Sequence, residues 1–282
     1  MMPKAPQKPA AKRWKAAFEM LRAHPEIEDV VVSGGDAYQL PALQLRGLIE
    51  SLLNIPSILR IRIASKGLGI GPMRILDDED PWTSALIDSV KLGRSMGKQV
   101  CLHTHINHAQ EISWTTELAA QKLFANGVTV RNQAVFLHGI NNSFIAQHTL
   151  IKALSRINIQ PYYVYQSDMV RGIEDLRTPL HEIIAVDKQI RGTVTGFMLP
   201  NFVVDLPGGG GKRLVSTYEE YNSAKGVATY MAPGLKGDKG KRVYRYFDPL
   251  HKAQVLEQGI GGPSHLQLYY APPQTKSIVS TS

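Results

Sequence analysis

Cysteine is nearly absent from this sequence. Cys101 is the only cysteine among 282 residues, so the chain cannot form an intramolecular disulfide. It also cannot hold an iron–sulfur cluster with three or four thiolates of its own. A lone thiol is typical of a reducing compartment, and we expect a cytoplasmic protein. A mitochondrial presequence is conceivable at residues 1–13, which are basic, but they contain no serine and their prolines oppose a helix.

Long apolar runs are missing as well. No run approaches the roughly 20 residues that a membrane-spanning helix needs, and residues 1–13 lack the apolar core of a secretion signal. The net charge of +8 would suit a nucleic-acid partner, but the basic residues are scattered and no aromatic-plus-arginine motif is present. We therefore expect neither a membrane nor a nucleic acid as partner, and we assign part of the charge to phosphate or carboxylate ligands.

The apolar residues that are present follow two periods, one typical of helices and one typical of strands. The helices are expected at residues 12–24, 44–53, 82–97, 115–126, 144–156 and 180–191. The strands are expected at residues 29–33, 58–63, 100–103, 129–130 with 133–135, 161–165 and from 202 onward. The three valines at 30–32 predict that the first of these strands is buried.

Strands that alternate with helices of this length indicate parallel βαβ units, so the predicted fold class is α/β. About six strands favour a partial (β/α) barrel over a complete one of eight. The chain is expected to divide into a basic proline-rich tail, the barrel, a C-terminal extension and a disordered tail, at residues 1–12, 13–215, 216–258 and 259–282. Within the extension, residues 227–230 and 243–247 are predicted to form a hairpin.

Polar residues follow each predicted strand. Because the carboxyl ends of parallel strands share one face of a barrel, these side chains should converge there. In chain order they are Ser33 to Asp36, Ser65 and Lys66, His103 to His108, Asn132 and Gln133, Gln166 to Asp168, and Asp205 with Lys212. Their repetition after strand upon strand predicts a binding or catalytic site at this face.

Two of these groups have simpler interpretations. Asp36 can cap the helix that follows it, which is the commoner use of a Ser-Gly-Gly-Asp turn. His103, His105 and His108 could ligate zinc, but no clear carboxylate partner accompanies them in the sequence, so structural histidines are favoured.

A run of four glycines, 208–211, separates the last predicted strand from Lys212. Glycines let a backbone approach a ligand closely, so the loop could bring the amine of Lys212 to a ligand. The alternative is a flexible surface loop with a solvated lysine. A phosphate-binding P-loop is excluded, since Leu206 stands six residues before Lys212 and Arg213 takes the place of Ser or Thr. The glycines at 67–71 likewise lack the spacing of a dinucleotide fingerprint.

Several segments of the chain form a recognisable set: Asp29-Val-Val-Val-Ser-Gly-Gly-Asp36, Thr104-His-Ile-Asn-His108, Asn132-Gln133, Pro161-Tyr-Tyr-Val-Tyr-Gln-Ser-Asp168, Arg177-Thr-Pro179 and residues 202–212. Together they resemble the lysine 2,3-aminomutase family of radical S-adenosylmethionine (SAM) enzymes. The resemblance spans roughly residues 12–212, and its Pro-Gly-Gly-Gly-Gly-Lys and Tyr-Tyr-x-Tyr-Gln-x-Asp motifs are specific to aminomutases of this type.

The resemblance implies a partial barrel of the radical SAM type and an isomerase that interconverts L-lysine and β-lysine. It implies that Lys212 is catalytic and carries pyridoxal phosphate as a Schiff base, and that Asp168 and Asp205 grip the distal ammonium of lysine. The methionine end of SAM would be held by Ser33, Gly34, Gly35 and Asp36, with Gln133 and His105 beside it.

The sequence departs from the family in two places. The family has three cysteines, spaced C-x3-C-x2-C, ahead of the helix that begins here near Lys12, and they hold a 4Fe-4S cluster. That motif and the first barrel strand are absent here, so no metal ligands are predicted. Lys66 stands where the family usually has arginine, which replaces a forked donor with a point charge.

Three hypotheses follow. The first is an aminomutase domain without its amino-terminal part, with L-lysine as its small-molecule substrate. The second is a remnant that binds pyridoxal phosphate or SAM but has no radical chemistry. The third is a scaffold protein that keeps the fold alone. A homo-oligomer is compatible with each.

Overall fold

The computed structural model describes residues 10–170 and 172–249. The tail predicted at 259–282 and most of the tail predicted at 1–12 lie outside these residues. The helices are α1 (Ala10–Ala23), α2 (Ala42–Leu53), α3 (Gly67–Ile70), α4 (Met73–Leu76), α5 (Pro81–Ser95), α6 (Trp114–Ala125), α7 (Phe144–Arg156) and α8 (Leu180–Ile190). The strands are β1 (Asp29–Val32), β2 (Arg60–Ala64), β3 (Gln99–Thr104), β4 (Thr129–Phe136), β5 (Ile159–Gln166), β6 (Asn201–Leu206), β7 (Gly211–Leu214), β8 (Glu220–Asn222), β9 (Val227–Met231) and β10 (Val243–Phe247).

Local sequence signals account for where several helices begin. The Asp80 carboxylate accepts a hydrogen bond from the backbone N–H of Trp82 at 2.8 Å, and Pro81 occupies the first turn of α5. The Ser113 hydroxyl accepts one from the N–H of Thr116 at 3.2 Å and so caps α6. All six predicted helices are present, with ends within a few residues of the expected positions.

Strands β1 to β7 form a seven-stranded sheet in sequence order. The pairs β1–β2, β2–β3, β3–β4 and β5–β6 are parallel, which confirms the predicted βαβ units, and β7 runs antiparallel to β6. Strand β7 was not predicted, because its glycine and lysine residues lack the apolar alternation of a strand.

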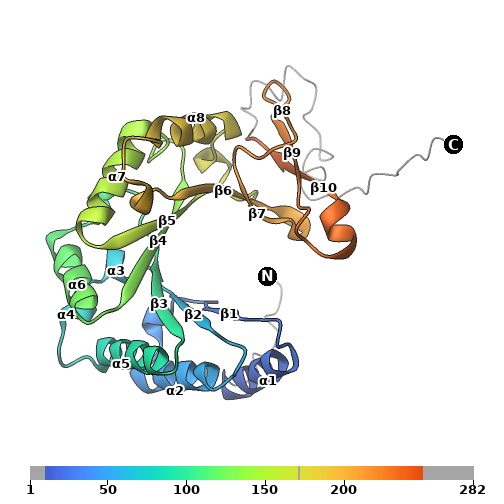
Figure 1. Ribbon diagram of the computed structural model, residues 1–282. Helices are drawn as coiled ribbons and strands as arrows, with labels where there is room; N and C mark the ends of the chain where they lie inside the picture. The colour runs from blue at the N-terminus through green and yellow to red at the C-terminus, as the bar shows by residue number, and fades with distance from the viewer. Residues whose placement is uncertain (1–9, 171, 250–282) are drawn as a thin grey trace. The chain divides into compact units, whose positions relative to one another are not determined.

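The chain divides into two compact units, and β4 contributes residues to both. The first unit comprises residues 1–106, 110–132 and 154–160. In it, α2 and α5 lie side by side along one face of β1 to β3 (Figure 1). Its core contains the fully buried side chains of Leu45, Ile49, Ile61, Trp82 and Leu86.

Strand β1 is less buried than its sequence suggests. Three consecutive valines predicted a buried strand, but Val31 is 45% exposed and its neighbours are half-buried. Among the described residues β1 pairs only with β2, so it forms an edge of the sheet. An edge strand lacks neighbours on one side, and its side chains keep more contact with water.

The second unit comprises residues 107–109, 133–153 and 161–282. Here β6 buries three consecutive apolar residues, Phe202 to Val204, as expected for an interior strand. A separate three-stranded sheet has the order β10–β9–β8, with both pairs antiparallel. It contains the predicted hairpin and adds β8, which was not predicted.

Candidate functional site

The β6–β7 hairpin holds two of the predicted site residues in one register position. Asp205 on β6 pairs directly with Lys212 on β7. The Lys212 ammonium Nζ donates to Asp205 Oδ2 at 3.0 Å, and both side chains are 40% exposed. Lys212 therefore lies on a strand and not in the flexible loop that one interpretation of the sequence offered.

The structure explains why each of the positions 208–211 is a glycine, either by its backbone angle or by its close neighbours. Three of the four glycines have positive φ: Gly208 (+74°), Gly209 (+86°) and Gly211 (+70°), a region closed to most residues. At the remaining one, Gly210, a Cβ atom would lie 2.7 Å from a carbon of the Tyr244 ring. The glycines therefore form a tight turn that fixes the position of Lys212.

Tyr165 adds an aromatic face beside the lysine. Its ring centre lies 5.5 Å from Lys212 Nζ, within the range of a cation–π interaction. The sequence predicted no role for Tyr165, although it is part of the Tyr-Tyr-x-Tyr motif. Its position two residues after Tyr163 on β5 puts the two tyrosines on the same face of the strand, which is the signal that could have found it.

Asp168 follows β5 and has an exposed side chain, whereas Gln166 and Ser167 just before it are fully buried. Partial loss of hydration and the Asp205 carboxylate raise the pKa of Asp168 above its usual value, and Lys212 and Arg177 oppose this rise. The structure thus brings Asp168, Asp205 and Lys212 into one electrostatic environment. That the two carboxylates bind a substrate ammonium stays a prediction.

Gln133 belongs to the same unit and lies half-buried on β4. Burial alternates along this strand, so Gln133 and the buried Asn132 lie on opposite faces. The Asn132 amide holds the backbone of Ile106, accepting from its N–H at 2.8 Å and donating to its carbonyl at 2.9 Å. Asn132 thereby fixes the chain next to His105 in the first unit.

The predicted SAM-binding residues lie in the first unit, after β1. Ser33, Gly34 and Gly35 are exposed, and Gly34 has a φ of +100°. The Asp36 carboxylate accepts hydrogen bonds from the backbone N–H groups of Tyr38 at 2.9 Å and Lys66 at 3.0 Å. Asp36 is therefore a capping residue, as one interpretation of the sequence held, and it ties the loop after β1 to the loop after β2.

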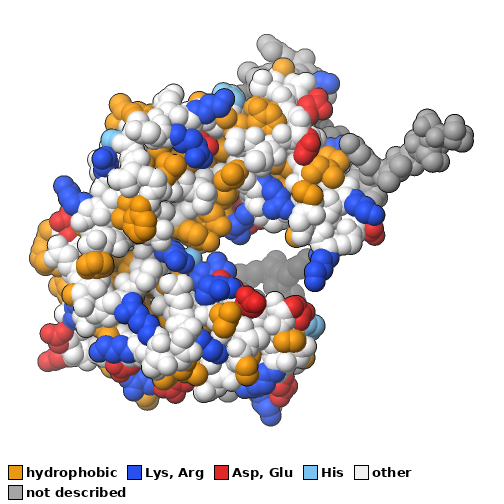
Figure 2. Space-filling view, in the orientation of Figure 1, with side chains coloured by type: hydrophobic (Ala, Val, Ile, Leu, Met, Phe, Trp, Pro, Cys, Tyr) orange, Lys and Arg blue, Asp and Glu red, His pale blue; other side chains and the backbone are white. Residues whose placement is uncertain are grey.

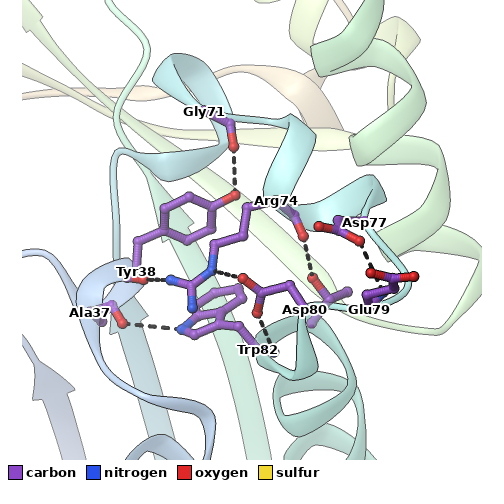
Figure 3. A network of polar contacts seen from close by, with 9 residues as sticks. Ala37, Tyr38, Gly71, Arg74, Asp77, Glu79, Asp80 and Trp82 are labelled. Atoms are coloured by element: carbon purple, nitrogen blue, oxygen red, sulfur yellow. Dashed lines mark hydrogen bonds and ion pairs between the residues drawn. The ribbon is translucent and has the colours of Figure 1, made fainter.

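A polar network supports this loop (Figure 3). The Tyr38 hydroxyl donates to the carbonyl of Gly71 at 2.6 Å, and its ring lies where a Cβ of Gly67 would be, which explains the glycine there. Arg74 donates to the Tyr38 carbonyl and to Asp80. Burial raises the pKa of Tyr38 to about 12, so the hydroxyl stays a donor at neutral pH.

His105 lies half-buried near Lys66 and Glu111, whose charged ends are 3.7 Å apart. Burial and the positive charge of Lys66 lower the pKa of His105. Its imidazole is therefore neutral at neutral pH and can accept a hydrogen bond from a ligand.

No group of three or more His, Cys, Asp or Glu side chains within residues 10–170 and 172–249 is arranged to hold a metal ion. Cys101 is buried in β3 with its Sγ 3.8 Å from the carbonyl of Ile61, and burial raises the pKa of its thiol. The described residues therefore do not fit the 4Fe-4S cluster of the family.

Two surface properties bear on partners. On the face shown in Figure 2, Lys and Arg side chains are interspersed with Asp and Glu and form no continuous basic stripe. A helix long and apolar enough to cross a bilayer is not found among the described residues. The expectation of no nucleic-acid partner stays a prediction.

The sheet with its intervening helices matches the fold of a solved protein. The crystal structure of Streptococcus suis SuiB bound to precursor peptide SuiA aligns with a TM-score of 0.50 and 13% sequence identity, over 71% of this chain and 43% of that one. At this identity the similarity concerns the fold alone. The fold is a partial (β/α) barrel, as the sequence predicted.

Curated relatives define the family more closely. L-lysine 2,3-aminomutase of Acetoanaerobium sticklandii is 37% identical over 201 residues, which are 71% of this chain and 46% of the relative. The enzyme of the same name from Bacillus subtilis is 36% identical over 201 residues, 71% of this chain and 40% of the relative. Glutamate 2,3-aminomutase of Clostridioides difficile is 33% identical over 196 residues, which are 70% of this chain and 44% of the relative.

The matched part of this chain is similar to the lysine 2,3-aminomutase family. The chain spans less than half the length of these curated relatives. No protein-family model matches it.

Proposed function

We propose that this chain carries the pyridoxal phosphate and lysine-binding part of an aminomutase that interconverts L-lysine and β-lysine in the cytoplasm. The observation that carries the proposal is the set of three charged residues in the second unit. Lys212 and Asp205 form an ion pair on the β6–β7 hairpin, and Asp168 interacts electrostatically with both. Relatives named lysine 2,3-aminomutase support the same assignment.

The residues around Lys212 fit pyridoxal phosphate. Its side chain is 40% exposed, so an aldehyde can reach it, and the turn at 208–211 fixes its position. Pyridoxal phosphate, when bound, supplies an electron-accepting ring to the nitrogen of an amino acid. Lys212 would hold it covalently, and the Tyr165 ring beside the Lys212 amine offers an apolar face to the same space.

Binding through the Lys212 nitrogen also changes the partner of Asp205. A Lys212 nitrogen that holds the cofactor would no longer be free to pair with the Asp205 carboxylate. Burial and then the Asp205 charge raise the pKa of Asp168, so the two carboxylates repel each other. A substrate ammonium relieves this repulsion, whereas the carboxylate of glutamate increases it, so the site favours lysine over glutamate.

For SAM, the fit concerns the loop at 33–36. Its exposed glycines allow close approach of a ligand, and the carboxylate of Asp36 can accept further hydrogen bonds beyond the two that it makes. We propose that this loop holds the methionine end of SAM, with His105 of the same unit beside the cofactor. SAM, when bound, supplies an adenosyl group for radical chemistry.

A second candidate function is a pyridoxal phosphate protein without radical chemistry. The lack of a metal-binding group among the described residues and the buried Cys101 favour it. Joining this chain to a segment that carries C-x3-C-x2-C, followed by anaerobic treatment with iron and sulfide, separates the two functions. A stoichiometric cluster with conversion of lysine to β-lysine by the joined protein would support the first, and cofactor binding without conversion would support the second.

The proposed substrate is tested by titrating the protein loaded with pyridoxal phosphate with lysine, glutamate and norleucine, and recording the visible absorbance. We expect lysine to bind more tightly than norleucine, which lacks the ammonium, and glutamate to bind more weakly than both. Equal affinity for lysine and glutamate would contradict the proposal.

A further inference from the structure

The predicted lysine-binding residue Asp168 is held from both sides by one strand of the C-terminal sheet. The backbone carbonyl of Ser167, just before Asp168, accepts a hydrogen bond from the Tyr246 hydroxyl at 2.9 Å. The sulfur of Met169, just after it, accepts one from the N–H of Phe247 at 3.4 Å. Tyr246 and Phe247 are the last two residues of β10.

The Tyr246 hydroxyl uses its full hydrogen-bonding capacity in this arrangement. It donates to Ser167, and it accepts from Gln166 Nε2 at 3.0 Å and from Arg177 Nη2 at 3.1 Å. A phenol has one donor and two acceptor sites, so all three are occupied. Tyr246 and Gln166 are almost fully buried, where each hydrogen bond restricts motion more than at the surface.

Arg177 brings a charge to the same network. It is 5% exposed, its guanidinium also donates to the carbonyl of Phe247, and it lies 5.5 Å from the centre of the Tyr246 ring. An arginine keeps its charge at all ordinary pH values, and this charge favours the ionised form of Asp168. The network thus fixes the chain on both sides of Asp168, and its arginine offsets part of the rise in the pKa of that carboxyl.

The same strand contacts the other half of the candidate site. Tyr244 lies two residues before Tyr246 and is therefore on the same face of β10. Its ring packs against Gly210 in the turn that carries Lys212, and its hydroxyl donates to the carbonyl of Lys239 at 2.8 Å. One strand thus packs on the lysine hairpin and bonds to the Asp168 segment.

We propose that β10 determines the preference for an ammonium-bearing side chain, with Tyr246 as a positioning residue for Asp168. The inference rests on the proposed lysine site and extends it to a strand outside the barrel. Tyr246 does not touch the substrate in this account; it holds the chain so that the Asp168 carboxylate faces the cation.

The test compares Tyr246→Phe with Tyr230→Phe. Tyr230 is a matched control, because it is fully buried on the neighbouring strand β9 and its hydroxyl donates to the carbonyl of Val215 at 3.1 Å, away from Asp168. Each substitution removes one buried hydroxyl and keeps the ring. Lysine and norleucine affinities are measured by calorimetry on protein loaded with pyridoxal phosphate, and amide exchange is followed at residues 167–170.

We expect Tyr246→Phe to weaken lysine binding roughly tenfold, as for a lost buried hydrogen bond that positions a charged group. Norleucine affinity should change less than about twofold, since that ligand makes no contact with a carboxylate. Amide exchange should rise at 167–170 in this variant alone. Tyr230→Phe should lower the melting temperature about as much as Tyr246→Phe does, and should leave the affinities for lysine and norleucine unchanged.

Other results would overturn the inference. If Tyr246→Phe weakens the binding of lysine and of norleucine equally, Tyr246 has only a general structural role. The same follows if Tyr246→Phe and Tyr230→Phe weaken lysine binding equally. If the unmodified protein binds lysine no better than norleucine, the proposed substrate itself is wrong. Should Tyr246→Phe not fold, Met169→Leu is the second variant. It removes the sulfur that accepts from the Phe247 N–H and keeps the Tyr246 hydroxyl with its three partners. It should weaken lysine binding about threefold, and unchanged selectivity would contradict the proposal.

Discussion

Asp205 and Lys212 face each other across the β6–β7 hairpin, with 3.0 Å between the carboxylate and the ammonium. Their pairing depends on the length of the glycine turn. A shift of one residue in the register would put the two side chains on opposite faces of the hairpin. The four glycines thus contribute to the candidate chemistry by fixing this register.

The first prediction concerns the carboxylates. Asp205→Asn should weaken lysine binding by roughly 1–3 kcal/mol, because one charged hydrogen bond to the ammonium is lost. Stability should change little, since the ion pair with Lys212 is exposed and such pairs contribute about 0–1 kcal/mol. Lysine titration and urea unfolding measure the two effects. Asp238→Asn, which changes an exposed carboxylate in the 3-10 helix Gly237–Lys241, is the control and should alter neither.

The second prediction concerns the turn. Gly210→Ala should destabilise the protein by about 1–3 kcal/mol, because the added methyl overlaps the Tyr244 ring and Leu206. The control Gly234→Ala has nothing within 4 Å of the added methyl and should change stability by less than about 0.5 kcal/mol. Chemical denaturation measures both variants. Equal stability of the two would mean that the Tyr244 contact does not hold the turn.

The third prediction concerns acid stability. His103 is buried in β3, and burial together with Arg62 and Arg131 lowers its pKa to about 4. The pKa of this histidine is near 6.5 in the unfolded chain and about 4 in the folded chain. At a pH between these two values, His103 binds a proton in the unfolded chain and not in the folded chain. The stability that His103 contributes is therefore complete above pH 6.5 and is lost as the pH falls toward about 4.

The pKa shift of His103 from 6.5 to about 4 corresponds to a loss of about 3–4 kcal/mol of stability, at roughly 1.4 kcal/mol for each pH unit. Urea unfolding at a series of pH values between 7 and 4.5 should show a steeper loss in the unmodified protein than in His103→Gln. Parallel curves for the two proteins would mean that His103 is not the group that titrates.

Hydrophobic periodicity predicted most of the fold, because the helices and strands of the barrel have long, regular patterns. It failed at β1, where three valines indicated a buried strand but the sheet edge leaves Val31 exposed. It also missed β7, since an antiparallel return after four glycines has no apolar signal of its own. Hydrophobic periodicity depends only on neighbouring residues in the chain, so it does not indicate which strand lies at an edge of the sheet.

Part of the candidate site was likewise predictable. Asp168, Asp205 and Lys212 follow strand ends or a motif, and the structure brings the three into one electrostatic environment. Tyr246 was not predictable, because its partner Ser167 is 79 residues away in the chain. A tyrosine within an apolar strand looks like ordinary core until the partner of its hydroxyl is known.

The central claim is that Lys212 carries pyridoxal phosphate. The most direct measurement is reduction of the cofactor-loaded protein with borohydride, followed by digestion and mass spectrometry of the labelled peptide. We predict a single stoichiometric label on Lys212, its loss in Lys212→Ala with an unchanged fold, and its retention in Lys188→Ala, which changes an exposed lysine on α8. A label on another lysine, or none in the unmodified protein, would contradict the account.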